Sequence, residues 1–385
     1  MRVVVASERL GDLLTASEAL AAIIGGWADV APHDSLDGRA VSGGGRGMVE
    51  AIGAHRGGEL HVTPAQDALG RDTLATMLVL GDGAGRTAYL DAGQVCGPAP
   101  DGVGDAWPAL VRARTRGVGE LLLAARRLDV DRVVIGLQDA AVPDLGIGLL
   151  AAVAGVSGPL DLAELTGADV LALARAAREQ LAGITLQGTG DLHAPLLGLS
   201  GASVRAATTW GVGDSQAQHL ELIAGRLVHE IRHQSPEPRD LLTGLPIRID
   251  RRPGVGAGDG LGFGLGLLGA TVTDAHEAVL NAVGFVDALD GADLLVAGVE
   301  SIDAVSLHES TLPALVAAAA ARGIPAVALA ARGGLGRRET MAAGLSGAYA
   351  VYPTHQAWPP DADDLAQRLR LRAAAVARTW SPPWA

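Results

Sequence analysis

The stretch from Pro253 to Ala270 has the residue types and spacing of a site built from backbone groups. Glycine stands at nearly every second position of PGVGAGDGLGFGLGLLGA, and the gaps hold small or apolar residues. Such turns expose N–H groups that can bind a phosphate or a carboxylate. The same glycines also suit close packing of one backbone segment on another before a buried element. The run predicts a tight glycine loop and leaves both roles open.

Any fixed positive charge in a site of this chain must come from arginine, a metal ion or a helix N-terminus. The sequence contains no lysine, so all 30 basic residues are arginine. This excludes a Walker-type lysine, a Schiff-base lysine and a lysine general base.

Histidine and cysteine give two weaker signals. His229 and His233 stand four residues apart, a spacing that can ligate a metal ion on one helix face. No third ligand is evident, so a solvated histidine pair is the better interpretation. Cys96 is the only cysteine, which excludes an intramolecular disulfide and is typical of a reducing cytoplasm. We expect it to be a packed thiol rather than a nucleophile.

The composition is that of a globular protein with two or three domains. Of the 385 residues, 49% are hydrophobic and 19% are charged, which allows a large core. The formal net charge of −13 argues against non-specific binding to nucleic acid or to an anionic membrane. The apolar windows fall short of the roughly 18 residues of a membrane span, and the short N-terminal apolar run is typical of a strand rather than a signal peptide.

Both ends of the chain alternate short apolar runs with Ala/Leu-rich stretches. At the N-terminal end we expect a strand at 2–6, a helix at 15–25, a strand near 28–32, a glycine turn at 42–47 and a helix from 48. At the C-terminal end we expect strands at 292–297, 324–329 and 348–352, and helices at 312–322, 339–344 and 361–378. This alternation predicts a parallel sheet covered by helices.

The middle of the chain has a different pattern. Strand-like runs at 60–62, 76–80 and 87–90, with turn residues at 81–83, predict an antiparallel section. A helix at 119–128 and a buried strand at 131–136 follow. The pattern favours a mixed sheet there.

Nine segments follow one another in the order of the motifs of one protein family. Residues 3–16 resemble IAPDSFK…SA, 42–48 ADGGEGT, 67–71 DPLGR, 87–97 TAVIEMA..SG, 114–121 TTYGTGEL, 135–149 GIGGSATNDGGAGM, 191–198 DVDNPLLG, 253–265 PGAGAAGGLGAGL and 292–307 ADLVITGEGRLDAQTL. On these segments the chain resembles a divergent member of the bacterial glycerate kinase family, the two-domain type unrelated to P-loop kinases.

The resemblance implies an α/β protein of two domains. Residues 1–58 and 285–385 would form a flavodoxin-like domain with a doubly wound parallel sheet, and 59–284 a middle α/β domain with a mixed sheet. The active site would lie in the cleft between them. The implied activity is transfer of the γ-phosphoryl of ATP to D-glycerate, with ATP and Mg²⁺ as cofactors.

The resemblance also implies roles for particular residues. Asp191 would be the base that accepts the glycerate hydroxyl proton, and Glu8 stands where the family has its first catalytic-site Asp. Asp144 and Asp303 would be magnesium ligands. The ligand or its phosphate would be bound by Gly44, Gly45, Arg46, Gly256 and Gly260.

The chain departs from the family pattern mainly at polar positions. Gly43 and Arg46 replace Asp and Glu of ADGGEG, and both family lysines are lost, at Gly11 and Ser310. Other departures are Gln138–Asp144 for GGSATND, Ala194 for Asn, and Val299 and Ser301 for Glu and Arg of GEGRLD. Because removing one oriented charge from such a site costs about 3 kcal/mol, these departures predict weak or lost activity.

Two functions therefore remain open at the level of sequence. One is a divergent glycerate kinase. The other is a catalytically inactive protein of the same fold that binds a small anionic ligand or a partner. Arg9, Arg46 and Arg205, which replace Ser, Glu and Phe, would favour an anion if they line the cleft. For either function we expect a cytoplasmic protein that binds neither nucleic acid nor membranes.

Overall fold

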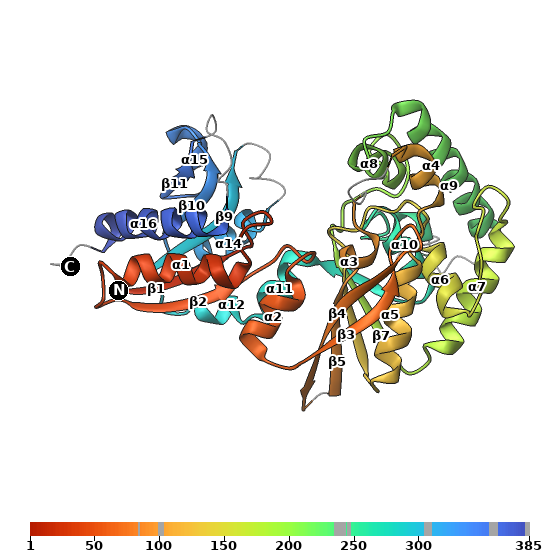
Figure 1. The fold of residues 1–385 in the computed structure, drawn as a ribbon, viewed down its shortest axis with the longest axis horizontal. Helices are drawn as coiled ribbons and strands as arrows, with labels where there is room; N and C mark the ends of the chain where they lie inside the picture. Colours follow the sequence, from red (N-terminus) through yellow and green to blue (C-terminus); the bar gives the residue numbers. More distant parts are fainter. Residues whose placement is uncertain are drawn as a thin grey trace. The chain divides into compact units, whose positions relative to one another are not determined.

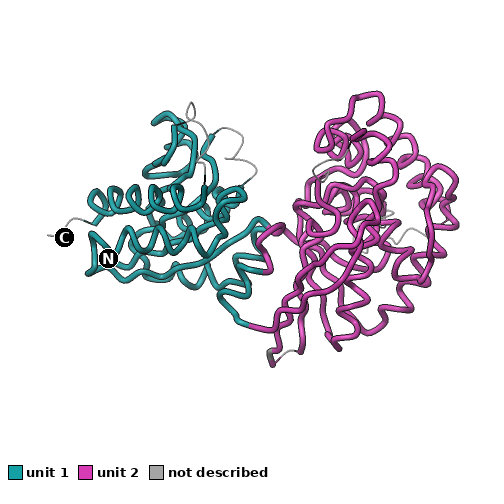
Figure 2. The backbone as a smooth tube through the Cα atoms, in the orientation of Figure 1, with its two compact units in different colours: residues 1–43, 50–57, 276–385 teal, residues 44–49, 58–275 magenta. Residues whose placement is uncertain are grey.

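The computed structural model describes residues 1–83, 85–98, 104–234, 244, 248–303, 310–353 and 361–381, which form two compact units. Unit 1 contains both ends of the chain, Met1–Gly43, Glu50–Gly57 and His276–Ala385; unit 2 contains Gly44–Val49 and Gly58–Ala275 (Figure 2). These bounds differ from the expected ones at 58 and 285, because residues 276–284 group with unit 1 and the glycine turn at 44–49 groups with unit 2.

Unit 1 is built on a five-stranded parallel sheet. Its strands, in sheet order, are β11 (Gly347–Tyr352), β10 (Ala326–Gly333), β9 (Leu294–Ile302), β1 (Arg2–Ser7) and β2 (Ser35–Ala40). Strand β1 lies between β2 and β9, with Val3 opposite Leu294 and Ala6 opposite Ala297. The order corresponds to that of flavodoxin-like doubly wound sheets. The predicted fold of the two chain ends is confirmed.

Helices α1 (Ala16–Ala28), α14 (Leu312–Ala320) and α16 (Ala362–Trp380) cover this sheet (Figure 1). Helices α1 and α16 pack against each other, and their apolar residues share one core with Val3, Val5, Leu294 and Val296. Helix α14 contacts β9 and β10. The other helices that lie wholly or mostly in unit 1 are α2 (Met48–Arg56), α11 (Ala275–Ala282), α12 (Phe285–Ala288) and α15 (Arg337–Ala342).

The first helix is longer than predicted. It starts after Thr15, close to the expected position, and Thr15 and Glu18 form a capping box there. It then runs through Gly25 and Gly26 to Ala28. A Cβ on Gly26 would collide with the backbone carbonyl of Arg370, so these glycines allow α16 to approach rather than end the helix. The strand expected near 28–32 is consequently wrong, and the strand lies at Ser35–Ala40 instead.

Unit 2 contains a six-stranded mixed sheet, as predicted. In sheet order its strands are β3 (Glu59–Gln66), β4 (Asp72–Asp82), β5 (Gly85–Asp91), β6 (Arg132–Gly136), β7 (Thr185–Gly190) and β8 (Thr271–Asp274). Strands β3, β4 and β5 pair antiparallel, and β5 to β8 pair parallel. The parallel half places the carboxyl ends of four strands at one edge, where ligands of α/β proteins bind.

The remaining helices belong to unit 2 (Figure 1). They are α3 (Gly93–Cys96), α4 (Ala106–Arg112), α5 (Arg116–Arg127), α6 (Ile147–Val153), α7 (Gly167–Gln180), α8 (Ala202–Thr209), α9 (Asp214–Gln234), the 3₁₀ helix η1 (Ile249–Arg251) and α10 (Leu261–Leu267). Within the described part of the chain, no helix is both long enough and apolar enough to cross a membrane.

Candidate functional site

Asp191 directly follows β7, at the carboxyl edge of the parallel strands of unit 2. Its side chain is exposed, and its Oδ1 accepts a hydrogen bond of 2.8 Å from the backbone N–H of His193. This contact orients the carboxylate and leaves it accessible to a substrate. The position fits the expected role of a base, since such residues lie at the carboxyl ends of parallel strands.

The glycine run supports the segment that carries Asp191. The N–H of Gly254 donates to the carbonyl of Leu192 at 3.0 Å, and a Cβ on Gly256 would collide with the carbonyls of Ala194 and Pro195. Gly260 has a φ of 98° and precedes α10, which begins at Leu261. The structure thus shows a packing role for Gly256 and a backbone-conformation role for Gly260, and their expected role in binding a ligand stays a prediction.

The second glycine turn lies in unit 2 beside the loop after β6. Gly44 has a φ of 87°, and a Cβ there would lie 2.6 Å from that of Ala275. The exposed Arg46 donates its backbone N–H to Oδ2 of Asp139 at 2.5 Å. A carboxylate of the protein itself therefore pairs with the backbone N–H of Arg46, one of the donors that we expected to bind an anion. Sequence reasoning missed Asp139, although its change from the family glycine was a visible signal.

Asp144 is buried in a network of hydrogen-bond donors. Its carboxylate accepts the N–H groups of Gly146 and Gly148 at 2.9 Å each, and both the N–H and the hydroxyl of Thr115. Burial raises the pKa of the Asp144 carboxyl, and the hydrogen bonds from Thr115 and Gly148 oppose that rise. With both oxygens engaged, the carboxylate fits a role in fixing the start of α6 better than the expected role of a magnesium ligand.

Glu8 directly follows β1 in unit 1 and is half-buried. Its Oε1 accepts the N–H of Thr311 at 2.7 Å. Burial raises the pKa of the Glu8 carboxyl, while Thr311 and the charge of His276 lower it. A Cβ on Gly43 would lie 3.7 Å from Nε2 of His276 and 3.8 Å from Oγ1 of Thr311. A Cβ at position 43 would therefore make only ordinary contacts, so close packing does not require the glycine there.

The other candidate ligands are not gathered into a metal centre within the described part of the chain. Asp303 directly follows β9, and residues 304–309 lie outside the described part of the chain. His229 and His233 are exposed on α9 with ring centroids 4.1 Å apart. Among the described residues, no three or more His, Cys, Asp or Glu side chains are placed to hold a metal ion.

Cys96 is a packed thiol, as predicted. It is buried at the end of α3, with Sγ 3.0 Å from the carbonyl oxygen of Ala92. Burial and the charges of Asp144 and Asp91 raise the pKa of the thiol well above its ordinary value. A neutral thiol is a poor nucleophile.

Comparison with known proteins agrees with this fold and with the order of the motifs. The model of the glycerate kinase family matches residues 3–381. The chain belongs to the glycerate kinase family. A protein of Mycobacterium bovis without an assigned function is 32% identical over 91% of this chain and 84% of its own length. Glycerate kinase of Bacillus subtilis is 27% identical over 86% of this chain and 85% of its own length. Glycerate 2-kinase of Escherichia coli is 26% identical over 80% of this chain and 79% of its own length.

A solved structure supports the fold of this glycerate kinase family member. The crystal structure of a protein from Salmonella typhimurium LT2, titled putative glycerate kinase 2, aligns with a TM-score of 0.76 at 22% identity, covering 99% of this chain and 98% of that one. The agreement extends over both units.

Arg205 and Asp259 are two departures from the family pattern that contact each other. The family has Phe and Gly at these positions; here Nε of Arg205 donates to Oδ1 of Asp259 at 3.0 Å. The guanidinium also donates to the carbonyls of Pro195, Ser200 and Gly256. Arg205 thus ties α8 to the glycine run, and its hydrogen bonds make it a scaffold residue rather than the expected anion ligand.

This pair predicts a pH effect on stability. Burial raises the pKa of Asp259 from 3.8 to about 6, against the opposing effect of Arg205. Between about pH 4 and 6 the folded protein holds a proton that the unfolded chain has lost, so this group stabilises the fold at low pH and its contribution falls as pH rises. The unfolding free energy of Asp259→Asn minus that of wild type should therefore increase by on the order of 2–3 kcal/mol when the pH rises from 4 to 7. Urea unfolding at several pH values measures this difference, and a pH-independent difference would contradict it.

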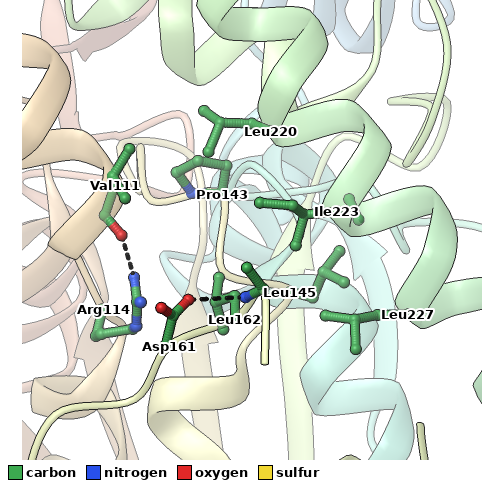
Figure 3. A pocket seen from close by; sticks show the side chains of 11 residues that line it. Val111, Arg114, Pro143, Leu145, Asp161, Leu162, Leu220, Ile223 and Leu227 are labelled. Atoms are coloured by element: carbon green, nitrogen blue, oxygen red, sulfur yellow. Dashed lines mark hydrogen bonds between the residues drawn. The ribbon is translucent and has the colours of Figure 1, made fainter. Parts of the chain in front are cut away.

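A small pocket in unit 2 is lined mainly by apolar side chains. Leu220, Ile223 and Leu227 of α9 form one wall, and Arg114 and Asp161 lie on the other side (Figure 3). The Arg114 guanidinium donates to the carbonyls of Val111 and Ala113 at 2.8 and 2.7 Å. The cavity of about 30 Å³ has room for a water molecule or two. It is too small for a nucleotide or a sugar acid.

Proposed function

We propose that this protein transfers the γ-phosphoryl group of ATP to D-glycerate, with Asp191 taking the proton of the acceptor hydroxyl. Asp191 carries the proposal: it is an exposed carboxylate at the carboxyl end of a parallel strand, oriented by the N–H of His193. The glycine run supports its segment through Leu192, Ala194 and Pro195. Membership of the glycerate kinase family over residues 3–381 supports the reaction class.

Apart from a metal ion and helix N-termini, the positive charges that would stabilise the transferred phosphoryl group must come from arginine in this chain. Phosphoryl transfer depends mainly on positioning and on fixed positive charge. Both lysines of the family pattern are absent, and Arg205 is engaged with backbone carbonyls and Asp259. We therefore propose a turnover below the ordinary enzyme range of about 1–10³ per second.

Magnesium would reach this site with the nucleotide. Mg²⁺ is commonly bound by one or two carboxylates together with substrate phosphates rather than by an all-protein cage. The carboxylate of Asp144 already accepts hydrogen bonds from four donors. Among the described residues, no group of three or more His, Cys, Asp or Glu side chains could hold the ion. Asp303, at the end of β9, is the candidate that remains from the expected pair.

The proposed setting is the cytoplasm and the proposed ligands are small anions, glycerate and ATP. The single cysteine, buried as Cys96, is compatible with a reducing compartment.

A direct assay tests this function. Purified protein is incubated with γ-labelled ATP, Mg²⁺ and either D-glycerate, L-glycerate or glycerol, and labelled product is separated from ATP. We expect slow labelling of D-glycerate and none of glycerol, because glycerol lacks the carboxylate. Thermal shift with ATP, magnesium and glycerate, alone and combined, detects binding without transfer. Stabilisation without labelling would favour the binding-protein alternative over the kinase.

A further inference from the structure

The loop after β6 carries a carboxylate that contacts the 44–47 glycine turn. We propose that Asp139 is a specificity-determining residue, which keeps phosphate groups off this turn and leaves them to be bound elsewhere in the site. The inference rests on the proposed function only in taking the turn as part of the substrate site.

The contact of Asp139 with the turn is specific. Its Oδ2 accepts the backbone N–H of Arg46 at 2.5 Å. Backbone N–H groups on glycine turns are the donors that bind phosphate oxygens in anion sites. Here the donor at Arg46 is paired within the protein, so an anion would have to displace the carboxylate of Asp139 or lie beside it.

Two glycines leave the room that this carboxylate fills. A Cβ on Gly45 would collide with Oδ2 of Asp139, and a Cβ on Gly93 would lie 2.8 Å from the Cβ of Asp139. The half-buried side chain of Asp139 thus lies between the turn on one side and the start of α3 on the other. The carboxylate is held there by packing as well as by its hydrogen bond.

Two departures from the family pattern meet at this carboxylate. The family motifs that this chain resembles have Gly at 139 and Ala at 93, whereas this chain has Asp139 and Gly93. A Cβ at residue 93 would lie 2.8 Å from the Cβ of Asp139, so the glycine at 93 makes room for the aspartate. At residue 46 the carboxylate contacts the backbone N–H, which it takes from a ligand whatever the side chain there.

The test compares the binding of inorganic phosphate by wild type, Asp139→Asn and Asp139→Gly. Thermal shift and titration calorimetry are run against sodium chloride of equal ionic strength. We expect no phosphate-specific stabilisation of wild type, because phosphate would meet a like charge. Both variants should bind phosphate at least tenfold more tightly than wild type. Asp139→Asn keeps the side-chain volume and removes the charge, so its phosphate binding can be measured even if the glycine variant unfolds.

Gln138→Gly is the matched control. It restores the neighbouring glycine of the family without changing charge, and its phosphate response should equal that of wild type. Equal phosphate binding by wild type and both Asp139 variants would overturn the inference. A wild type that fails to phosphorylate glycerate would count against the proposed function alone, because the phosphate titration does not depend on catalysis.

Discussion

Replacing Asp144 by alanine should destabilise the protein by about 4 kcal/mol or more, the largest stability effect that we expect from one side chain. The carboxylate is buried and accepts hydrogen bonds from Gly146, Gly148 and Thr115. Each buried donor left without a partner costs about 1–3 kcal/mol. The melting temperature should fall by roughly 10 °C, measured by calorimetry together with urea unfolding.

Two further variants separate this scaffold role from metal binding. Asp144→Asn keeps one acceptor oxygen, so its unfolding free energy should lie between those of wild type and the alanine variant. Glu179→Ala removes an exposed carboxylate from α7 and should change stability by less than about 0.5 kcal/mol. If Asp144→Ala instead kept its stability and lost magnesium-dependent stabilisation by ATP, Asp144 would be a metal ligand after all.

Replacing Asp191 by asparagine should lower the D-glycerate-dependent labelling rate by about 10²–10⁴-fold, the range for loss of a general base. Asparagine has nearly the same shape and can still accept the N–H of His193, so the local backbone should persist. The binding of ATP should change little, since the variant alters the proton acceptor. Single-turnover labelling measures the rate, and thermal shift with ATP measures binding.

A control variant tests whether the loss of labelling is specific to Asp191 or follows from removing any exposed carboxylate of unit 2. Asp214→Asn removes an exposed carboxylate at the start of α9 and should leave labelling unchanged. An Asp191→Asn protein with the labelling rate of wild type would show that another group takes the hydroxyl proton.

The apolar patterns were sufficient to predict most of the fold. Runs such as VVVA at 3–6 and DLLVA at 293–297 are typical of buried parallel strands, and both lie side by side in one sheet. Local composition was less informative about α1, since Gly25 and Gly26 resembled a helix end. Only the close approach of α16 explains glycines inside that helix.

The sequence, through the family resemblance, singled out Asp191, and it showed that arginine replaces lysine throughout the chain. Only the structure shows that Asp191 directly follows a strand. The tertiary structure decided what the other polar residues do. Arg205 and Asp259 are 54 residues apart and Arg46 and Asp139 are 93 apart, yet each pair is joined by a hydrogen bond. Periodicity reports which face of an element is buried, and spacing reports local neighbours. The partner of a charged side chain is set by which strand ends and loops meet, and that follows from the pairing of whole sheets.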